Sequence, residues 1–71
     1  MWNLCTVGAK CREYRRRVLK VSLFYVSRTL GYSRENVSAF ENGRNDNCLI
    51  LLWYLSQGLT VDQIIGGVPI E

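Results

Sequence analysis

A short turn signal, Gly31-Tyr32-Ser33, lies between two segments whose apolar residues have helical spacing. Glycine readily adopts the left-handed backbone that ends a helix, and a serine hydroxyl caps the first turn of the next one. The sequence therefore predicts a helix over about residues 23–30, with Ser22 as its N-cap. It predicts a second helix over about residues 34–42, with Ser33 as its N-cap.

Each of these two helices has one side suited to burial. In the first, Val26, Ser27 and Leu30 form an apolar edge, and the small Ser27 allows a second helix to cross closely. In the second, Val37, Phe40 and Glu41 share one side of the helix. The polar side chains of the second helix are therefore expected to point away from the core.

Apolar spacing predicts three further helices. The first covers about residues 7–19, with Thr6 as its N-cap, and its core-facing stripe is Val7, Cys11, Tyr14 and Val18. A helix over about 47–57 follows an N-cap at Asn45 or Asp46 and ends at Gly58, and a last helix over about 61–65 starts with a capping box of Thr60 and Gln63. The expected fold is all-α, a compact bundle of about five short helices in a single domain, residues 1–71.

Composition excludes several classes of protein. The longest apolar run, Leu49–Leu55, is far shorter than a membrane span, and no signal-peptide pattern is present, so we expect a cytoplasmic protein without membrane contact. The chain has three cysteines and no histidine, and their spacing matches no zinc site, so Cys11 and Cys48 are expected to be reduced core residues. We expect no metal, no cofactor and no catalytic residue, because no nucleophile has a base beside it.

Charge divides the chain into two unequal parts. Residues 1–44 contain all nine Lys and Arg against three Glu, a balance of +6, whereas residues 45–71 contain three acidic residues and a balance of −3. A basic part that includes two helices joined by a tight turn is typical of phosphate binding. A solvated surface is an equally good explanation of the charge taken alone.

Specific residues connect this pattern to a known family. With Ser27, Gly31, Val37 and the run Phe40-Glu41-Asn42-Gly43-Arg44, the chain resembles the lambda-repressor-like helix-turn-helix family, the class of phage Cro and repressor DNA-binding domains. The resemblance extends more loosely from about Val7 to Ile65, and one residue of register stays undecided between the first two helices. It implies an ion pair from the first helix to Glu41, for which Arg15 is preferred over Arg16.

The resemblance also implies which residues contact DNA, because the family lays the first turn of its second motif helix in the major groove. Arg34 would bind guanine, Glu35 would accept a hydrogen bond from cytosine, and Ala39 would touch a thymine methyl group. The predicted DNA-binding residues are Arg34, Glu35, Asn36, Ser38, Ala39, Asn42 and Arg44. A simple surface ion pair of Arg34 with Glu35 is the alternative for those two.

The chain also departs from the family. Leu23 stands where a glutamine usually touches the DNA backbone, and Phe24 and Tyr25 replace polar residues. An exposed apolar edge of Leu23 and Phe24 would suit a protein partner. Tyr25, more than Phe24, is expected to fill a gap in the core.

Two functions are therefore expected from the sequence. The first is a sequence-specific regulator in the cytosol of a bacterial host, which binds a double-stranded DNA operator as a homodimer. The second is an antirepressor-like module that binds the DNA-binding domain of a second phage regulator. The apolar helix around Trp53 and Tyr54 is expected to form a subunit interface or to be buried, and the tail after Gly67 to dimerise or to fray.

Overall fold

The computed structural model describes residues 4–70, with side chains from Thr6 onward. It is all-α, and its helices run in the order α1 (Leu4–Tyr14), η1 (Arg15–Leu19), α2 (Leu23–Leu30), α3 (Arg34–Glu41), α4 (Cys48–Ser56) and α5 (Val61–Ile65). No β-strand occurs among the described residues. The predicted fold class, a compact all-α bundle of short helices, is confirmed.

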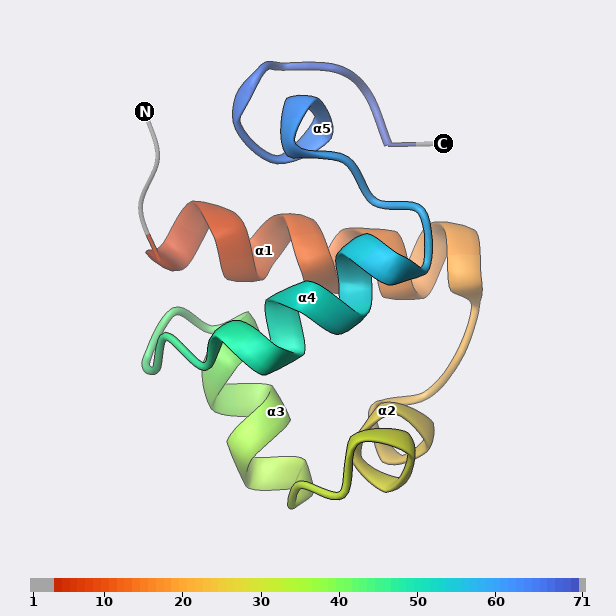
Figure 1. Ribbon diagram of the computed structural model, residues 1–71, viewed down its shortest axis with the longest axis vertical. Coiled ribbons are helices and arrows are strands. Elements are labelled where there is room, and N and C mark those ends of the chain that lie inside the picture. The colour runs from red at the N-terminus through yellow and green to blue at the C-terminus, as the bar shows by residue number, and fades with distance from the viewer. Residues whose placement is uncertain (1–3, 71) are drawn as a thin grey trace.

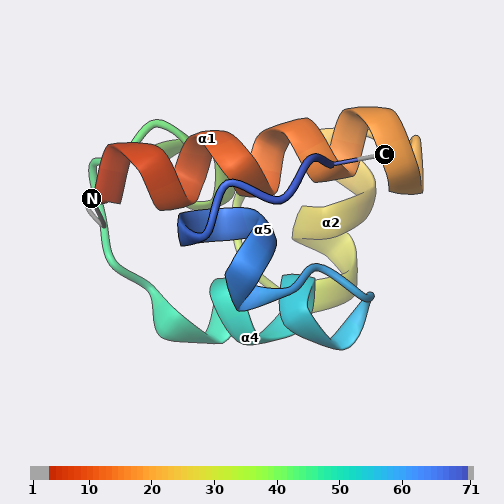
Figure 2. The same ribbon diagram turned by 90° about the horizontal axis from the view of Figure 1, so that it is seen from above.

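The long rod formed by α1 and η1 organises the other helices. Figure 1 shows this rod across the middle of the molecule, with α2 and α3 on one side and α5 on the other. The tail that follows α5 runs beside α1 (Figure 2), and its Ile70 is buried in the core. The tail therefore folds back on its own chain, at the opposite end of the molecule from the turn between α2 and α3.

The predicted caps of three helices are confirmed. The Ser22 hydroxyl accepts a hydrogen bond from the Tyr25 N–H at 3.1 Å, and the Ser33 hydroxyl accepts one from the Asn36 N–H at 3.1 Å. At α5 the capping box of Thr60 and Gln63 is complete. The starts of α2, α3 and α5 follow from these caps and agree with the predicted bounds.

Two predicted N-caps are wrong. Helix α1 already begins at Leu4, so Thr6 lies inside it and does not cap it. Helix α4 is capped by Asn47, whose side-chain oxygen accepts from the Leu49 N–H at 3.1 Å. Neither predicted candidate, Asn45 or Asp46, is the cap, and Asn45 instead accepts from the Asn47 N–H at 3.2 Å and shapes the preceding loop.

The π-helical segment η1 changes which residues of the first rod face the core. A π-helical turn contains more residues than an α-helical turn, so the apolar stripe shifts by one position. Val18 is therefore 37% exposed, against prediction, while Leu19 packs on the core and Arg15 is buried. Lys20, at φ 56°, ends the segment. The wide turn comes directly before the segment between the first two helices, where the sequence leaves one residue of register undecided.

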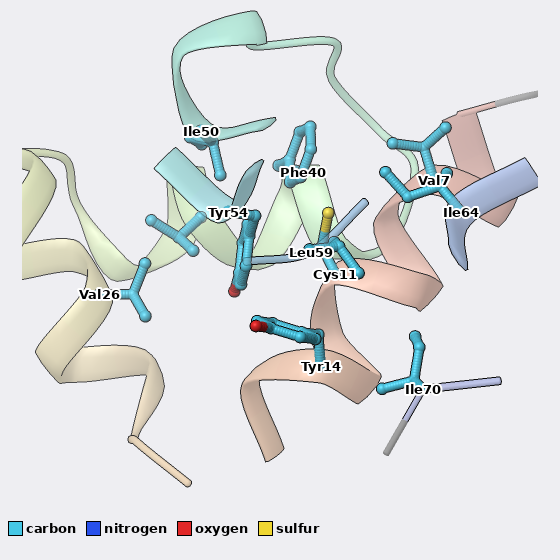
Figure 3. Packing of buried hydrophobic residues seen from close by; sticks show 11 residues of the cluster. Val7, Cys11, Tyr14, Val26, Phe40, Ile50, Tyr54, Leu59, Ile64 and Ile70 are labelled. Carbon is cyan, nitrogen blue, oxygen red and sulfur yellow. The ribbon is translucent and has the colours of Figure 1, made fainter. Parts of the chain in front are cut away.

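The core gathers apolar side chains from all parts of the bundle (Figure 3). Cys11 is fully buried, as predicted, whereas Cys48 lies exposed in the first turn of α4, against prediction. Tyr54 is also fully buried within this chain, so it is not available for a subunit interface. The buried hydrophobic residues are Val7, Cys11, Tyr14, Val26, Val37, Phe40, Ile50, Tyr54, Leu59, Ile64 and Ile70.

The buried Cys11 thiol makes the free energy of unfolding decrease at alkaline pH. Burial, with the charge of Glu41, raises the pKa of the Cys11 thiol from 9.0 to about 12. Because the raised pKa favours the neutral thiol in the folded state, this stabilisation is complete below pH 9 and is lost as pH rises toward 12. We expect the difference in unfolding free energy between the wild type and Cys11→Ala to shrink by about 1 kcal/mol between pH 9 and 10. Urea unfolding at the two pH values measures this, and a constant difference would contradict it.

Candidate nucleic-acid interface

The turn between α2 and α3 is fixed by local hydrogen bonds. Gly31 adopts φ 78°, and its N–H donates to the Ser27 carbonyl at 2.9 Å. The N–H of Tyr32 donates to the same carbonyl at 3.1 Å. Ser27 is itself buried, and its hydroxyl donates to the Phe24 carbonyl at 2.9 Å. The hydroxyl of the buried Ser27 thus has a hydrogen-bond partner within its own helix.

A buried polar network attaches the end of α3 to the rest of the bundle. The Arg15 guanidinium donates two hydrogen bonds to the Glu41 carboxylate, at 2.9 and 3.1 Å, and the Tyr54 hydroxyl donates a third at 2.6 Å. Arg15 also donates to the Val21 carbonyl at 3.1 Å. The predicted pair of Arg15 and Glu41 is confirmed, and it joins η1 to α3, while Tyr54 adds α4.

The network shifts the pKa values of its members. Burial alone would lower the pKa of Arg15, but the hydrogen bonds and negative charge of Glu41 outweigh burial and raise it above its usual value. Burial, together with the hydrogen bond to Glu41, raises the pKa of Tyr54 well above its usual range. Arg15 is therefore charged and Tyr54 neutral near pH 7, which is the arrangement that this hydrogen bonding requires.

The outward side of α3 gathers most of the predicted DNA-binding residues around one hollow. This hollow has a volume of about 370 Å³. Two of its lining residues are arginines, and Arg34 and Glu35 in the first turn of α3 are exposed. The lining residues are Leu23, Arg34, Glu35, Ser38, Ala39 and Arg44. Arg34 and Glu35 form no ion pair within the described part of the chain, so the alternative of a simple surface pair is not what the structure shows.

Two predicted residues lie elsewhere. The side-chain oxygen of Asn36 accepts a hydrogen bond from the Asn45 amide at 3.0 Å, and its backbone carbonyl accepts another at 3.2 Å. Asn36 therefore holds the loop between α3 and α4. Asn42 is exposed and lines a second, smaller hollow of about 190 Å³, where its amide donates to the Ser38 hydroxyl at 3.3 Å.

Aromatic side chains of α2 border this side of the molecule. Phe24 is 51% exposed and Tyr25 is 53% exposed, so Tyr25 does not fill a core gap as predicted. The guanidinium groups of Arg28 and Arg34 lie 5.6 and 5.8 Å from the centre of the Phe24 ring. Such cation–π contacts hold both cations beside the ring without neutralising them.

Sequence reasoning missed two residues that shape this surface. Gly8 of α1 lies against the backbone of Phe40 and Glu41. A glycine inside a helical pattern is the signal that could have indicated such a close approach. Arg12 of α1 lines the hollow of about 190 Å³ together with Ser38 and Asn42. Nothing local in the sequence distinguishes Arg12 from its basic neighbours, because its place depends on how α1 crosses α3.

No protein-family model, curated protein or solved structure matches this chain. Among the described residues, no helix is both long enough and apolar enough to cross a bilayer. Within residues 6–70, whose side chains are described, no three acidic or cysteine side chains come together that could hold a metal ion.

Proposed function

We propose that this chain is a sequence-specific DNA-binding transcriptional regulator of the phage Cro and repressor type, with a lambda-repressor-like helix-turn-helix formed by α2 and α3. The observation that carries the proposal is the outward side of α3, where Arg34 and Arg44 border one hollow. The Arg15, Glu41 and Tyr54 network holds this helix on a rigid base. The major groove of DNA suits a polar helix edge that is held in place and carries arginines without an ion pair among the described residues.

The residues of this surface fall into two proposed roles. Arg34, Glu35 and Ala39 read base edges, because the first turn of α3 and its exposed side enter the groove. Ser38, Asn42 and Arg44 bind phosphates and set the position of the helix on the duplex. The acidic α5 lies at the opposite end of the molecule from α2 and α3 (Figure 1), which keeps Asp62 away from the duplex.

Substitution of the two arginines separates these roles. We expect Arg34→Ala to remove about 1 to 3 kcal/mol of discrimination at one base pair. We expect Arg44→Ala to weaken binding to all sequences and to reduce the salt slope by about one phosphate contact. Fluorescence anisotropy with operator and scrambled duplexes, from 50 to 200 mM salt, measures both effects. Equal losses for the two variants on every duplex would contradict the assignment.

The proposed regulator binds its pseudo-palindromic operator as a homodimer in the host cytosol. Leu49 and Leu52 of α4 are each 56% exposed, an apolar area that a second subunit would cover. The reading helices of such dimers lie about 34 to 36 Å apart. A molar mass of one chain per operator, by light scattering of the complex, would contradict the dimer.

The exposed rings of α2 favour a second candidate, an antirepressor-like module that binds another regulator's DNA-binding domain. Phe24 and Tyr25 border a hollow of about 490 Å³ together with Arg28. In that case Phe24→Glu abolishes activity but leaves the DNA affinity of this chain unchanged. Footprinting of the DNA around its gene, with this protein, a neighbouring repressor and both, distinguishes the two functions. Loss of the repressor footprint in the mixture, without a footprint of this protein alone, supports the second.

A further inference from the structure

The hollow of about 190 Å³ between α1 and α3 carries a further inference. It is lined by Arg12, Arg15, Leu23, Ser38, Glu41 and Asn42. It shares Leu23 and Ser38 with the hollow of about 370 Å³ that holds Arg34 and Arg44. Ser38 thus lines both hollows, and each has an exposed arginine in its lining, Arg12 in the smaller one and Arg44 in the larger one.

The charges that face the smaller hollow leave one uncompensated cation. Arg15 and Glu41 neutralise each other through two hydrogen bonds, and the Tyr54 hydroxyl occupies a further site on the carboxylate. The side chains of Arg15 and Glu41 are only 11% and 4% exposed. Arg12 is exposed and forms no ion pair within residues 4–70. The hollow therefore presents a net positive charge, supplied by Arg12.

Polar groups suited to an anion lie beside Arg12. The Ser38 hydroxyl accepts from the Asn42 amide at 3.3 Å, so its own hydrogen is directed elsewhere and can be donated. A guanidinium binds phosphate oxygens through two parallel hydrogen bonds, which is geometry that a lysine does not reproduce. Arg12, Ser38 and Asn42 together provide the donors that one phosphate group requires.

We infer that Arg12, with Ser38 and Asn42, forms a binding site for a phosphate group of the DNA backbone, in a hollow that adjoins the one lined by Arg44. This inference rests on the proposed function, because it requires α3 to lie in the major groove. The groove is about 12 Å wide and has a phosphate chain on each side. Arg12 and Arg44 then contact different phosphates of the duplex. The site also supplies a phosphate contact close to Leu23, whose own apolar side chain cannot bind phosphate.

The test compares Arg12→Ala with Arg17→Ala, a matched control on the same rod. Arg17 carries the same charge, but it is paired with Glu13 at 2.9 Å. It borders a hollow of about 500 Å³ together with Arg12 and Asn42, but it does not line the smaller hollow that contains Ser38. We expect Arg12→Ala to lower affinity for operator and scrambled duplexes by the same factor. Affinity falls when salt rises from 50 to 200 mM, and we expect this fall to be about 3.5-fold smaller for Arg12→Ala than for the wild type, because one phosphate contact is lost. Arg17→Ala should keep the wild-type salt slope.

Further variants separate phosphate binding from packing. Arg12→Lys keeps the charge, so it should restore the salt slope while recovering only part of the affinity. Thermal unfolding of Arg12→Ala should match the wild type, since the side chain is exposed. If Arg12→Ala and Arg17→Ala have equal salt slopes while the wild type binds DNA, the inference is wrong and the proposed function stands. If the wild type binds no duplex, the proposed function fails and this site fails with it.

Discussion

Glu41→Gln is expected to lower the free energy of unfolding by about 3 to 5 kcal/mol. The substitution keeps the shape of the side chain and an oxygen that can accept from the Tyr54 hydroxyl. It removes the negative charge that faces the Arg15 guanidinium in two hydrogen bonds. Since both side chains are buried, the remaining cation has neither water nor a counter-charge. Urea denaturation followed by circular dichroism at 222 nm provides the measurement.

The control for this variant is Glu13→Gln. Glu13 also pairs with an arginine, Arg17, at 2.9 Å, but the two side chains are 35% and 62% exposed. An exposed pair of this kind contributes about 0 to 1 kcal/mol. A 71-residue domain has a total stability of only about 4 to 11 kcal/mol, so Glu41→Gln should leave a partly unfolded protein near 37 °C. Equal decreases in the free energy of unfolding for the two variants would show that burial of the network contributes nothing to stability.

The local parts of the fold could be predicted from the sequence. Caps act through neighbouring residues, so Ser22, Ser33 and Thr60 fix the starts of their helices wherever these helices pack. Gly31 likewise takes its left-handed conformation for a local reason. The pair of Arg15 and Glu41 spans the fold and was predicted because the chain resembles a family that has such a pair.

The errors arise where a distant contact or a change of helix type decides the outcome. An α-helical period placed Val18 on the core, but the π-helical segment turns it outward. Helix α4 is apolar on nearly all sides, so its sequence could not show that Tyr54 faces inward and Cys48 outward. The sequence predicts Asn45 or Asp46 as the cap of α4, whereas the contacts of Asn45 with Asn36 and Asn47 depend on the shape of the loop.

The candidate site, like the fold, could be predicted only where local pattern decides it. Helical periodicity alone places Arg34, Glu35 and Ser38 away from the buried side of α3, and the structure brings them to one hollow. The contribution of Arg12 depends on the crossing of α1 and α3, which no local pattern in the chain specifies. That crossing is in turn fixed by a residue without a side chain, Gly8.

Gly8→Ala is expected to destabilise the protein by about 3 kcal/mol, because overpacking at a tight crossing costs that much when neither side can yield. A Cβ atom at this position would overlap the Phe40 carbonyl oxygen and lie 2.7 Å from the Glu41 carbonyl oxygen. Both are backbone atoms, and Glu41 is held by Arg15 and Tyr54. In a helix without such a contact the same change would stabilise by up to about 1 kcal/mol, so the sign of the effect tests the crossing.

Ala9→Gly is the matched variant for this crossing. Ala9 follows Gly8 in α1 but is exposed, so its replacement should cost only the helix propensity of alanine, about 1 kcal/mol. If helix propensity alone decided stability, Gly8→Ala would be more stable than Ala9→Gly. If the close contact at Gly8 decides it, Gly8→Ala is the less stable of the two. Thermal unfolding of both variants decides between the two orders. If Gly8→Ala melts above Ala9→Gly, α1 and α3 do not cross this closely, and the placement of Arg12 beside Ser38 is wrong as well.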